Sequence, residues 1–313
     1  MLRMVWGREK TMNRKISRKI NRKRRKHFYH IGMFGRLLAT LPSSTPLLYP
    51  IYLAAQLDTV EETYVSSQWP KEFDGLKIAY LSDIHYGTLL KEDRVRKLAQ
   101  RVNELEADIV LLGGDYAENS SGAVEFFQLK PGFQARIAVL GAYGNHDRLW
   151  PESNMDRIAR EMRQDGVIPM LNDVYMIKRN GKQIAFASTD DYYKGKPALY
   201  KVAQQCRKAD FTVFFPHNPD ILPETYHMPG GPFYQLAICG HTHGGQVAIG
   251  GHAIKSSSIY GDRYLSGWKH EQGRDILVSN GVGTSGLPVR FGARPQIHLL
   301  TMKTKEEKKP PAE

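Results

Sequence analysis

The 313-residue chain has only two cysteines, Cys206 and Cys239, and they stand 33 positions apart. Two isolated thiols supply neither a zinc ribbon nor the disulfide framework of a small secreted domain. They are compatible with either side of a membrane. The fold must therefore depend on a hydrophobic core, for which 41% apolar residues in a chain of this length are sufficient.

Outside its N-terminus the chain also lacks net charge. Residues 1–36 hold 13 Lys or Arg against one acid, Glu9, which accounts for the whole net charge of +12, so residues 37–313 sum to zero. A neutral body has no field that steers it onto a polyanion, and this argues against a nuclease or another nucleic-acid binder. The basic arm is typical of a solvated tail or of a segment that lies on an anionic surface.

Charge is absent again between Arg36 and Asp58, where 21 residues carry none. Their length and polarity predict a membrane anchor or signal-like segment at 37–57. The basic arm before it predicts an extracytoplasmic body, with the cytoplasmic face of the membrane as the alternative. Three prolines favour a proline-rich linker instead, because each removes a helix hydrogen bond. The polar stretch 58–72 predicts a linker or an edge strand.

The body of the chain is predicted at 73–302, and a charged tail that contains two prolines follows at 303–313. An Asn180-Gly181 pair predicts a hairpin turn. Strands and helices alternate in the first half and strands dominate the second, which predicts one α/β domain with helices covering sheets. Short apolar runs predict strands near 76–81, 109–112, 137–142, 211–215 and 236–239, and helical spacing predicts helices near 95–105, 155–162 and 199–206.

Each of five predicted strands ends in side chains that bind metals. In an open α/β sheet, sites form in the crevice outside the carboxyl ends of the strands, so these side chains are expected to lie together. Oxygen and imidazole ligands without thiolate suit Mn, Fe or Zn. Singly, each Asp could be a turn residue and each His a satisfied polar group, but the combination favours a metal site. The five sets are Asp83 and His85, Asp115, Asn145 and His146, His217, and His241 and His243.

These residues resemble the motif set of the calcineurin-like metallophosphoesterases, over residues 76 to about 300. Two further motifs, His217-Asn218-Pro219-Asp220 and Gly281-x-Gly283-Thr284, are similar to those of the bacterial YkuE-type branch. Members of that branch often carry an N-terminal membrane or export segment. The resemblance implies a four-layer α/β/β/α sandwich with two mixed central sheets. It rests on Asp83-x-His85, Gly114-Asp115, Gly144-Asn145-His146-Asp147, His217 and Gly240-His241-x-His243.

The same resemblance implies a centre of two divalent ions. Asp83, His85 and His243 would hold one ion, and Asn145, His217 and His241 the other, with the Asp115 carboxylate bridging both. A hydroxide shared by the ions would attack phosphorus. His146 would protonate the leaving group or stabilise its charge. Asp147 could orient His146 by accepting from its other ring nitrogen, or could be a helix N-cap.

The motifs indicate phosphate-ester chemistry and leave the substrate open. Tyr260 and Arg263, in the loop at 250–267, and Arg290 and Arg294 are candidate substrate-binding residues, with solvated loop positions as the alternative. A body beyond a membrane anchor predicts a lipid-linked or cell-envelope phosphoester. Alternatives are a soluble nucleotide phosphodiesterase, a sugar-nucleotide lipid pyrophosphohydrolase and a non-catalytic metal-binding scaffold. The complete ligand set with His146 argues against the scaffold.

Overall fold

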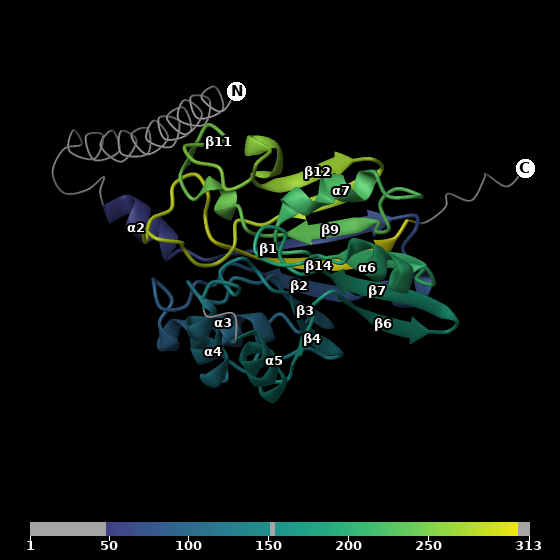
Figure 1. Cartoon of the computed structure of the whole chain (residues 1–313), viewed down its shortest axis with the longest axis horizontal. Coiled ribbons are helices and arrows are strands. Elements are labelled where there is room, and N and C mark those ends of the chain that lie inside the picture. Colours follow the sequence, from purple (N-terminus) through teal and green to yellow (C-terminus); the bar gives the residue numbers. More distant parts are fainter. Residues whose placement is uncertain (1–47, 151–153, 306–313) are drawn as a thin grey trace, which may run out of the picture. The chain divides into compact units, whose positions relative to one another are not determined.

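The computed structural model describes residues 48–150 and 154–305. The chain divides into two units, Met1–Pro50 and Ile51–Glu313, and the second contains the sheets (Figure 1). Helix α2 (Leu48–Ala54) crosses the boundary between them. No helix in the described ranges is long and apolar enough to span a membrane. The predicted basic arm 1–36, and residues 37–47 of the predicted anchor, lie outside these ranges.

The second unit is built on two six-stranded sheets (Figure 1). The first has the order β1 (Asp58–Ser66), β14 (Gln296–Thr304), β2 (Lys77–Leu81), β3 (Ile109–Leu112), β4 (Ala138–Gly141) and β5 (Val167–Pro169). Strands β2 to β5 are parallel, and β14 and β1 run opposite to them.

The second sheet has a similar plan. Its four central strands are parallel and its two edge strands are antiparallel to their neighbours. The edge strand β6 forms the predicted hairpin with β7, and Asn180 and Gly181 both take the positive φ that a tight turn of this kind requires. The strand order is β12 (Gly267–Glu271), β13 (Arg274–Val278), β9 (Leu236–Cys239), β8 (Phe211–Phe214), β7 (Lys182–Ser188) and β6 (Asp173–Arg179).

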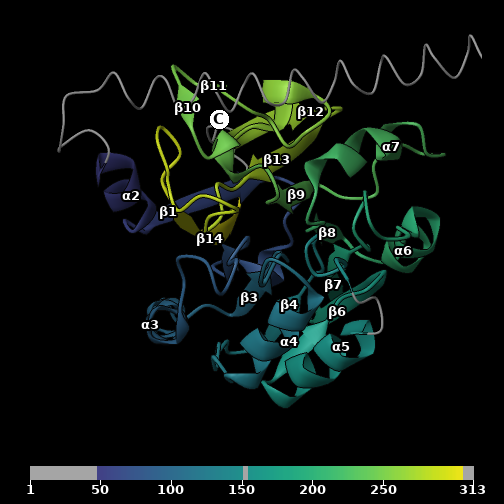
Figure 2. The same ribbon diagram turned by 60° about the vertical axis from the view of Figure 1, so that its left-hand side comes forward.

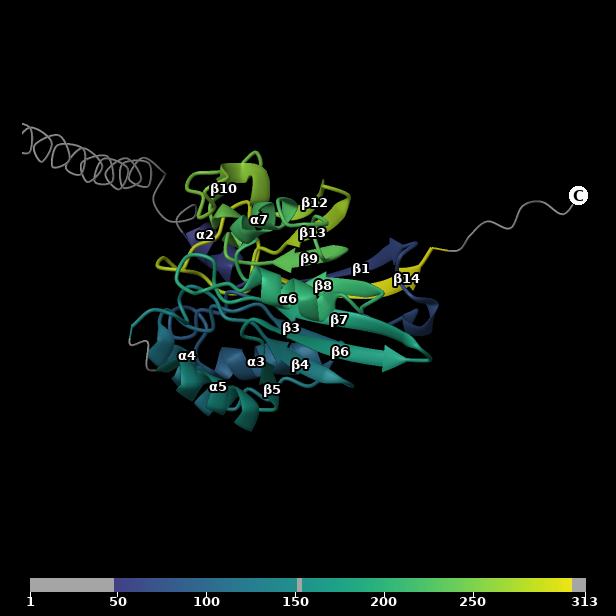
Figure 3. The same ribbon diagram turned by 45° about the vertical axis from the view of Figure 1, so that its right-hand side comes forward.

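Alternating side chains along the strands explain the layers. In β2, Ile78 and Tyr80 join a core between the two sheets, whereas Ala79 and Leu81 join a core under the helices. Helices α3 (Glu92–Asn103), α4 (Ser120–Gln128) and α5 (Met155–Gln164) cover the first sheet. Helices α6 (Leu199–Cys206) and α7 (Leu222–Tyr226) cover the second (Figures 2 and 3). The predicted four-layer sandwich is confirmed.

The stretch that follows α2 is an edge strand, which was one of the two alternatives predicted for it. Residues 58–66 form β1, paired in parallel register with β14 from Asp58 opposite Gln296 onward. Its polar sequence fits a position with one neighbouring strand and an open edge. Near its end the buried Tyr64 packs its ring on Trp268 (5.8 Å between centroids) and donates its hydroxyl to Asp275 (2.8 Å).

Loops from the two sheets meet at one edge of the sandwich. The parallel strands β2, β3 and β4 end there, and the strands β8 and β9 of the other sheet end beside them. Within the second sheet Gly240 N donates to His217 O (2.9 Å), and within the first Asp83 N donates to Gly114 O (2.9 Å). Between the two sheets, His241 N donates to the Asp83 carboxylate (3.1 Å). The parallel strands at the centre of each mixed sheet thus deliver the loop residues of both halves of the chain to one place.

Candidate metal centre

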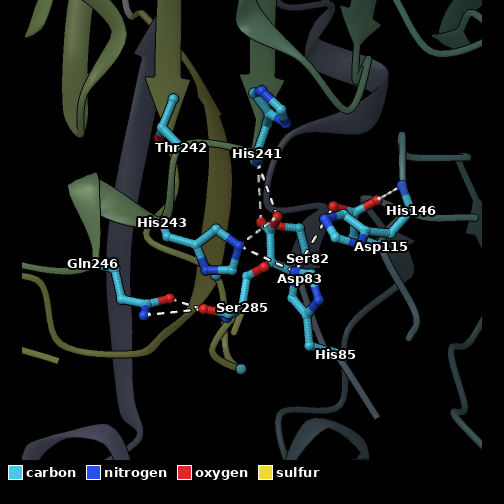
Figure 4. A network of polar contacts seen from close by, with 12 residues as sticks. Ser82, Asp83, His85, Asp115, His146, His241, Thr242, His243, Gln246 and Ser285 are labelled. Carbon is cyan, nitrogen blue, oxygen red and sulfur yellow. Dashed lines mark hydrogen bonds and ion pairs between the residues drawn. The ribbon is translucent and has the colours of Figure 1, made fainter. Parts of the chain in front are cut away.

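Asp83, His85 and His243 form the first group of candidate ligands. All three are buried, and one ligand atom from each lies within 4.8 Å of the others. The Nε2 atoms of His85 and His243 are 3.1 Å apart, and His243 Nε2 is 3.4 Å from Asp83 Oδ1 (Figure 4). Two imidazoles and one carboxylate that converge in this way fit a divalent cation.

Asp115, His217 and His241 form the second group, with the same spacing limit of 4.8 Å. His217 Nδ1 lies 2.8 Å from Gly113 O, which leaves Nε2 as the nitrogen that faces the carboxylates. Within the described part of the chain, two atoms here have no hydrogen-bond partner although they are buried: Asn145 Oδ1 and His241 Nε2. Buried ligand atoms without partners are what a cation would satisfy.

The Asp115 carboxylate lies between the two groups. Its Oδ2 is 3.2 Å from His217 Nε2 and 3.8 Å from His85 Nε2. Its other oxygen, Oδ1, accepts from the backbone N–H of His146 at 2.8 Å. One carboxylate oxygen is therefore near histidines of both groups, while the second accepts a hydrogen bond from the backbone.

Backbone strain is concentrated at these residues. Eleven described non-glycine residues have positive φ, and five of them are candidate ligands. Such a conformation costs about 1 kcal/mol or more per residue, so the surrounding packing must impose it. It turns each side chain away from its strand direction and into the shared space. The five are Asp83, His85, Asp115, His241 and His243.

The electrostatics divide the histidines. Burial and the positive charge of His217 lower the pKa of His241 to about 4. Burial, His85 and Arg290 lower the pKa of His243 well below its usual range. Both rings are therefore neutral at pH 7 and keep a lone pair for a cation. By contrast, Asp115 and Asp83 raise the pKa of His217 to about 10, although burial opposes this. The raised pKa reflects a strongly negative potential that a divalent cation would neutralise.

His146 stands at the border of the site, and Glu118 holds it. The His146 side chain is 21% exposed, and its Nδ1 lies 2.9 Å from the backbone oxygen of Glu118. The Glu118 carboxylate is 3.1 Å from His85 Nδ1 and 3.6 Å from His146 Nδ1. Glu118 therefore contacts both a candidate ligand and the candidate proton donor. Sequence reasoning missed it, and its only signal is its position three residues after Asp115.

Asp147 does not have the position expected from the sequence. Its carboxylate accepts from three backbone N–H groups, those of Asp115 (2.8 Å), Tyr116 (3.0 Å) and Gly144 (2.8 Å). It thus ties the loop after β3 to the loop after β4, and Glu118 is the partner of His146 instead. Burial, followed by the charge of Asp115, raises the pKa of Asp147 to about 7.

Arg290 also differs from its expected role as a phosphate ligand. It is fully buried, and its guanidinium donates to the carbonyl oxygens of Gly283, His243 and Asn280. One of its terminal nitrogens lies 3.2 Å from His243 Nδ1. With its donors used in this way, Arg290 holds the loop around a candidate ligand and has no exposed face for a substrate.

The other candidate substrate residues lie among partners of their own. Arg263 donates to Glu271 through two nitrogens (2.7 and 2.6 Å) and lies over the ring of Tyr260 at 5.4 Å. Arg294 is half-exposed and pairs with Asp58 at 3.2 Å. For these three residues, contact with a substrate stays a prediction.

Tyr193 borders the second group and was not predicted from the sequence. Its ring centroid is 5.7 Å from that of His241, and its hydroxyl donates to the buried carboxylate of Asp220. Asp220 also accepts from the backbone of Ile259 (2.8 Å) and from the side chain of Ser258. The loop at 250–267, which contains two of the candidate substrate-binding residues, is thereby tied to Asp220, three residues after His217.

A sandwich that collects imidazoles and carboxylates at the carboxyl ends of parallel strands has the architecture of a metal-binding α/β protein. Residues 76–245 match the family model of calcineurin-like phosphoesterases. The chain belongs to this family, and it is a hydrolase of phosphoric ester bonds.

Relatives of this kind occur in bacteria and in a vertebrate. The metallophosphoesterase YkuE of Bacillus subtilis is 28% identical over 280 residues, which cover 87% of this chain and 96% of that protein. The phosphodiesterase YaeI of Escherichia coli is 26% identical over 230 residues, 72% of this chain and 82% of that protein. A transmembrane protein with a metallophosphoesterase domain from Danio rerio is 24% identical over 284 residues, 85% of this chain and 62% of that protein.

Proposed function

We propose that this phosphoesterase uses two divalent cations and hydrolyses a lipid-linked or cell-envelope phosphoester at a membrane. The position of Asp115 carries the chemical part of the proposal. Its carboxylate oxygen is 3.8 Å from His85 Nε2 in one candidate group and 3.2 Å from His217 Nε2 in the other. A shared carboxylate couples two neighbouring cation sites.

The donor atoms fit such cations. Asp83, His85 and His243 would hold one ion, Asn145, His217 and His241 would hold the other, and Asp115 would contact both. The set has imidazole, carboxylate and amide donors and no thiolate, which suits Mn, Fe or Zn. When bound, the two ions would polarise the phosphate oxygens and lower the pKa of a water molecule into the neutral range.

The protein's own contribution is to hold this arrangement and to move one proton. Because His146 Nδ1 is engaged by Glu118 O, Nε2 is the ring nitrogen available to protonate the leaving oxygen. The partly exposed ring lets a substrate approach from solvent. The candidate ligands are buried, so little water reaches them, and the low local dielectric strengthens the electrostatic contacts within the site.

The membrane part of the proposal is supported by the N-terminal sequence and by helix α2. A basic arm of 36 residues precedes 21 uncharged residues. In α2, Ile51 and Tyr52 are 40% and 59% exposed. Exposed aromatic and aliphatic side chains on a short uncharged helix favour the membrane interface. The Danio rerio relative is named a transmembrane protein, which is consistent with this proposal.

The test is hydrolysis of bis(p-nitrophenyl) phosphate by the full chain, after chelation and again after addition of Mn²⁺. We expect chelation to abolish turnover and Mn²⁺ to restore it. Asp115→Ala should lower kcat at least 10³-fold, because metal ions stabilise the transition state by several kcal/mol, about 4 at this ratio. Asp156→Ala, at an exposed position of α5, is the matched control. If the folded, metal-bound protein hydrolysed neither the diester nor p-nitrophenyl phosphate nor any lipid, the result would favour the alternative of a non-catalytic metal-binding scaffold.

The basic arm before the uncharged segment supports an extracytoplasmic body. Protease added to intact cells should then digest residues 58–305, as it would in lysed cells. Protection of the body until the cells are lysed would favour the cytoplasmic face instead.

A further inference from the structure

A groove of about 290 Å³ lies between the end of α2 and helix α3. This volume is close to the lower end of typical ligand pockets, roughly 300 Å³. One wall is apolar and one rim is basic. The wall includes Leu57, Leu89, Leu90 and Val282, and the rim consists of Arg94, Lys97 and Arg101.

The topology puts this groove at the same edge of the sandwich as the metal centre. Strand β1 runs parallel to β14 and opposite to β2, so its first residue, Asp58, lies at the edge where β2 ends. The wall is also hydrogen-bonded to the site: Val282 N donates to Ser82 O (3.0 Å), and Gly283 N donates to Asp83 O (2.7 Å). The segment that forms the wall of the groove is therefore hydrogen-bonded directly to the segment that carries the candidate metal ligand Asp83.

The basic rim carries charge that the described residues leave unpaired. Arg94, Lys97 and Arg101 share one face of α3 because they are three and four positions apart. Arg94 and Lys97 are exposed, and in residues 48–150 and 154–305 no carboxylate pairs with either side chain. Arg101 donates to Leu57 O (2.8 Å) and Thr59 Oγ1 (3.0 Å), which are uncharged, so its charge remains.

An apolar groove with three positive charges at its mouth is complementary to an anionic amphiphile. A membrane phospholipid combines these features with the exposed apolar side chains of Ile51 and Tyr52 on the adjoining helix. We propose that this groove binds an acyl chain of an anionic phospholipid, whose phosphate lies against Arg94, Lys97 and Arg101. The inference rests on the proposed membrane function and deepens it, because the bound lipid would hold the edge that bears the metal centre against the bilayer.

The test is photo-crosslinking of the full chain to vesicles of phosphatidylcholine that contain phosphatidylglycerol with a diazirine in its acyl chain. Peptides that contain Leu57, Leu89 or Leu90 should be labelled. Each basic residue near an anionic surface strengthens binding about fivefold, so Arg94→Gln with Lys97→Gln should lower this labelling on the order of 25-fold at limiting lipid. Ala55→Trp, which fills the groove without changing charge, should lower it too.

A second double variant distinguishes the effect of charge at the groove from the effect of the total charge of the protein. Lys201→Gln with Lys208→Gln removes the same charge at or just beyond α6, at exposed positions, and should leave the labelling unchanged. Label confined to residues 1–47 would overturn the proposal, since the N-terminal segments would then bind the lipid or occupy the groove. Equal labelling in all variants, or with zwitterionic vesicles alone, would also overturn it.

Hydrolysis of bis(p-nitrophenyl) phosphate is measured in parallel and should be the same in every variant. A chain that is labelled in the groove but has no metal-dependent turnover would contradict the proposed function and leave the groove established. A chain that hydrolyses the diester but is not labelled in the groove would support the proposed phosphoesterase function and contradict lipid binding by the groove.

Discussion

Replacement of Arg290 by Met should destabilise the fold and loosen the metal centre together. The guanidinium is fully buried and donates to the carbonyls of Gly283, His243, Asn280 and Ala293. Burial lowers the pKa of Arg290 to about 10, which leaves it charged at neutral pH. Met has a similar length and no donor, so these buried carbonyls would lose their partner.

The magnitude follows from the hydrogen bonds. A bond to a charged group contributes about 1.5–3 kcal/mol, and loss of one buried charged partner costs about 3–5 kcal/mol. For a domain of this size that corresponds to a fall in Tm on the order of 10 °C. Because Arg290 also donates to the backbone oxygen of His243 (2.8 Å), this candidate ligand should be less well fixed without it, and Mn²⁺ affinity should fall about 10- to 100-fold.

Thermal unfolding, Mn²⁺ titration and steady-state hydrolysis of bis(p-nitrophenyl) phosphate would be measured on Arg290→Met and Arg290→Lys. At saturating Mn²⁺ the KM should stay close to that of the parent chain. The half-exposed Arg294 provides the control, since Arg294→Met removes an equal charge and should change stability by less than about 0.5 kcal/mol. An unchanged Tm with a raised KM in Arg290→Met would refute this reasoning and return Arg290 to the substrate-binding role that its sequence position suggested.

Asp147→Asn should lower the free energy of unfolding by about 2–4 kcal/mol, because an oxygen that accepts from two backbone N–H groups is replaced by an NH₂ donor. The pH profile of hydrolysis should keep its shape, and a shifted profile would instead link Asp147 to His146. His298 is buried, and burial lowers its pKa to about 4, so this side chain should contribute about 3 kcal/mol to the loss of stability as pH drops from 6.5 to 4, where the unfolded chain binds a proton that the folded chain does not. In His298→Leu the acid loss measured from denaturant midpoints should be smaller by about this amount, and a loss equal to that of the wild type would exclude His298 as one of its sources. Gly240→Ala should lower Mn²⁺ affinity at least about 10-fold, because its Cβ would lie 2.5 Å from Asp83 Oδ2, and retained affinity would show that the loop adjusts.

The sequence was sufficient for the sandwich and for the residues that gather at its edge. Asp83, Asp115 and His241 each follow an apolar run, and parallel strands must end at the same edge, so spacing alone predicts their proximity. The family resemblance supplied the layers and the division into two groups. The polar strand β1 was ambiguous because a strand with an open edge shows no clear alternation of apolar residues.

The supporting contacts were beyond prediction because they depend on where loops pack. Glu118 lies on a loop without periodicity, and only the fold brings its carboxylate to 3.1 Å from His85. Arg290 looks like a surface cation in a loop of glycine and proline, yet the chain closes around it. Both misjudgements have one cause: exposure of a loop residue is decided by tertiary contacts rather than by local composition.

The glycines of the motifs show the same limit. Gly240 does not have a positive φ, whereas the candidate ligands beside it, His241 and Asp83, do. A Cβ on Gly240 would lie 2.4 Å from Ser82 Oγ, and one on Gly144 would lie 2.1 Å from Asp115 Oδ1. These two positions need glycine for its volume, because the carboxylates occupy the space where a side chain would stand. The strain in the loops is therefore carried by the candidate ligands themselves, and the glycines give those ligands room to converge.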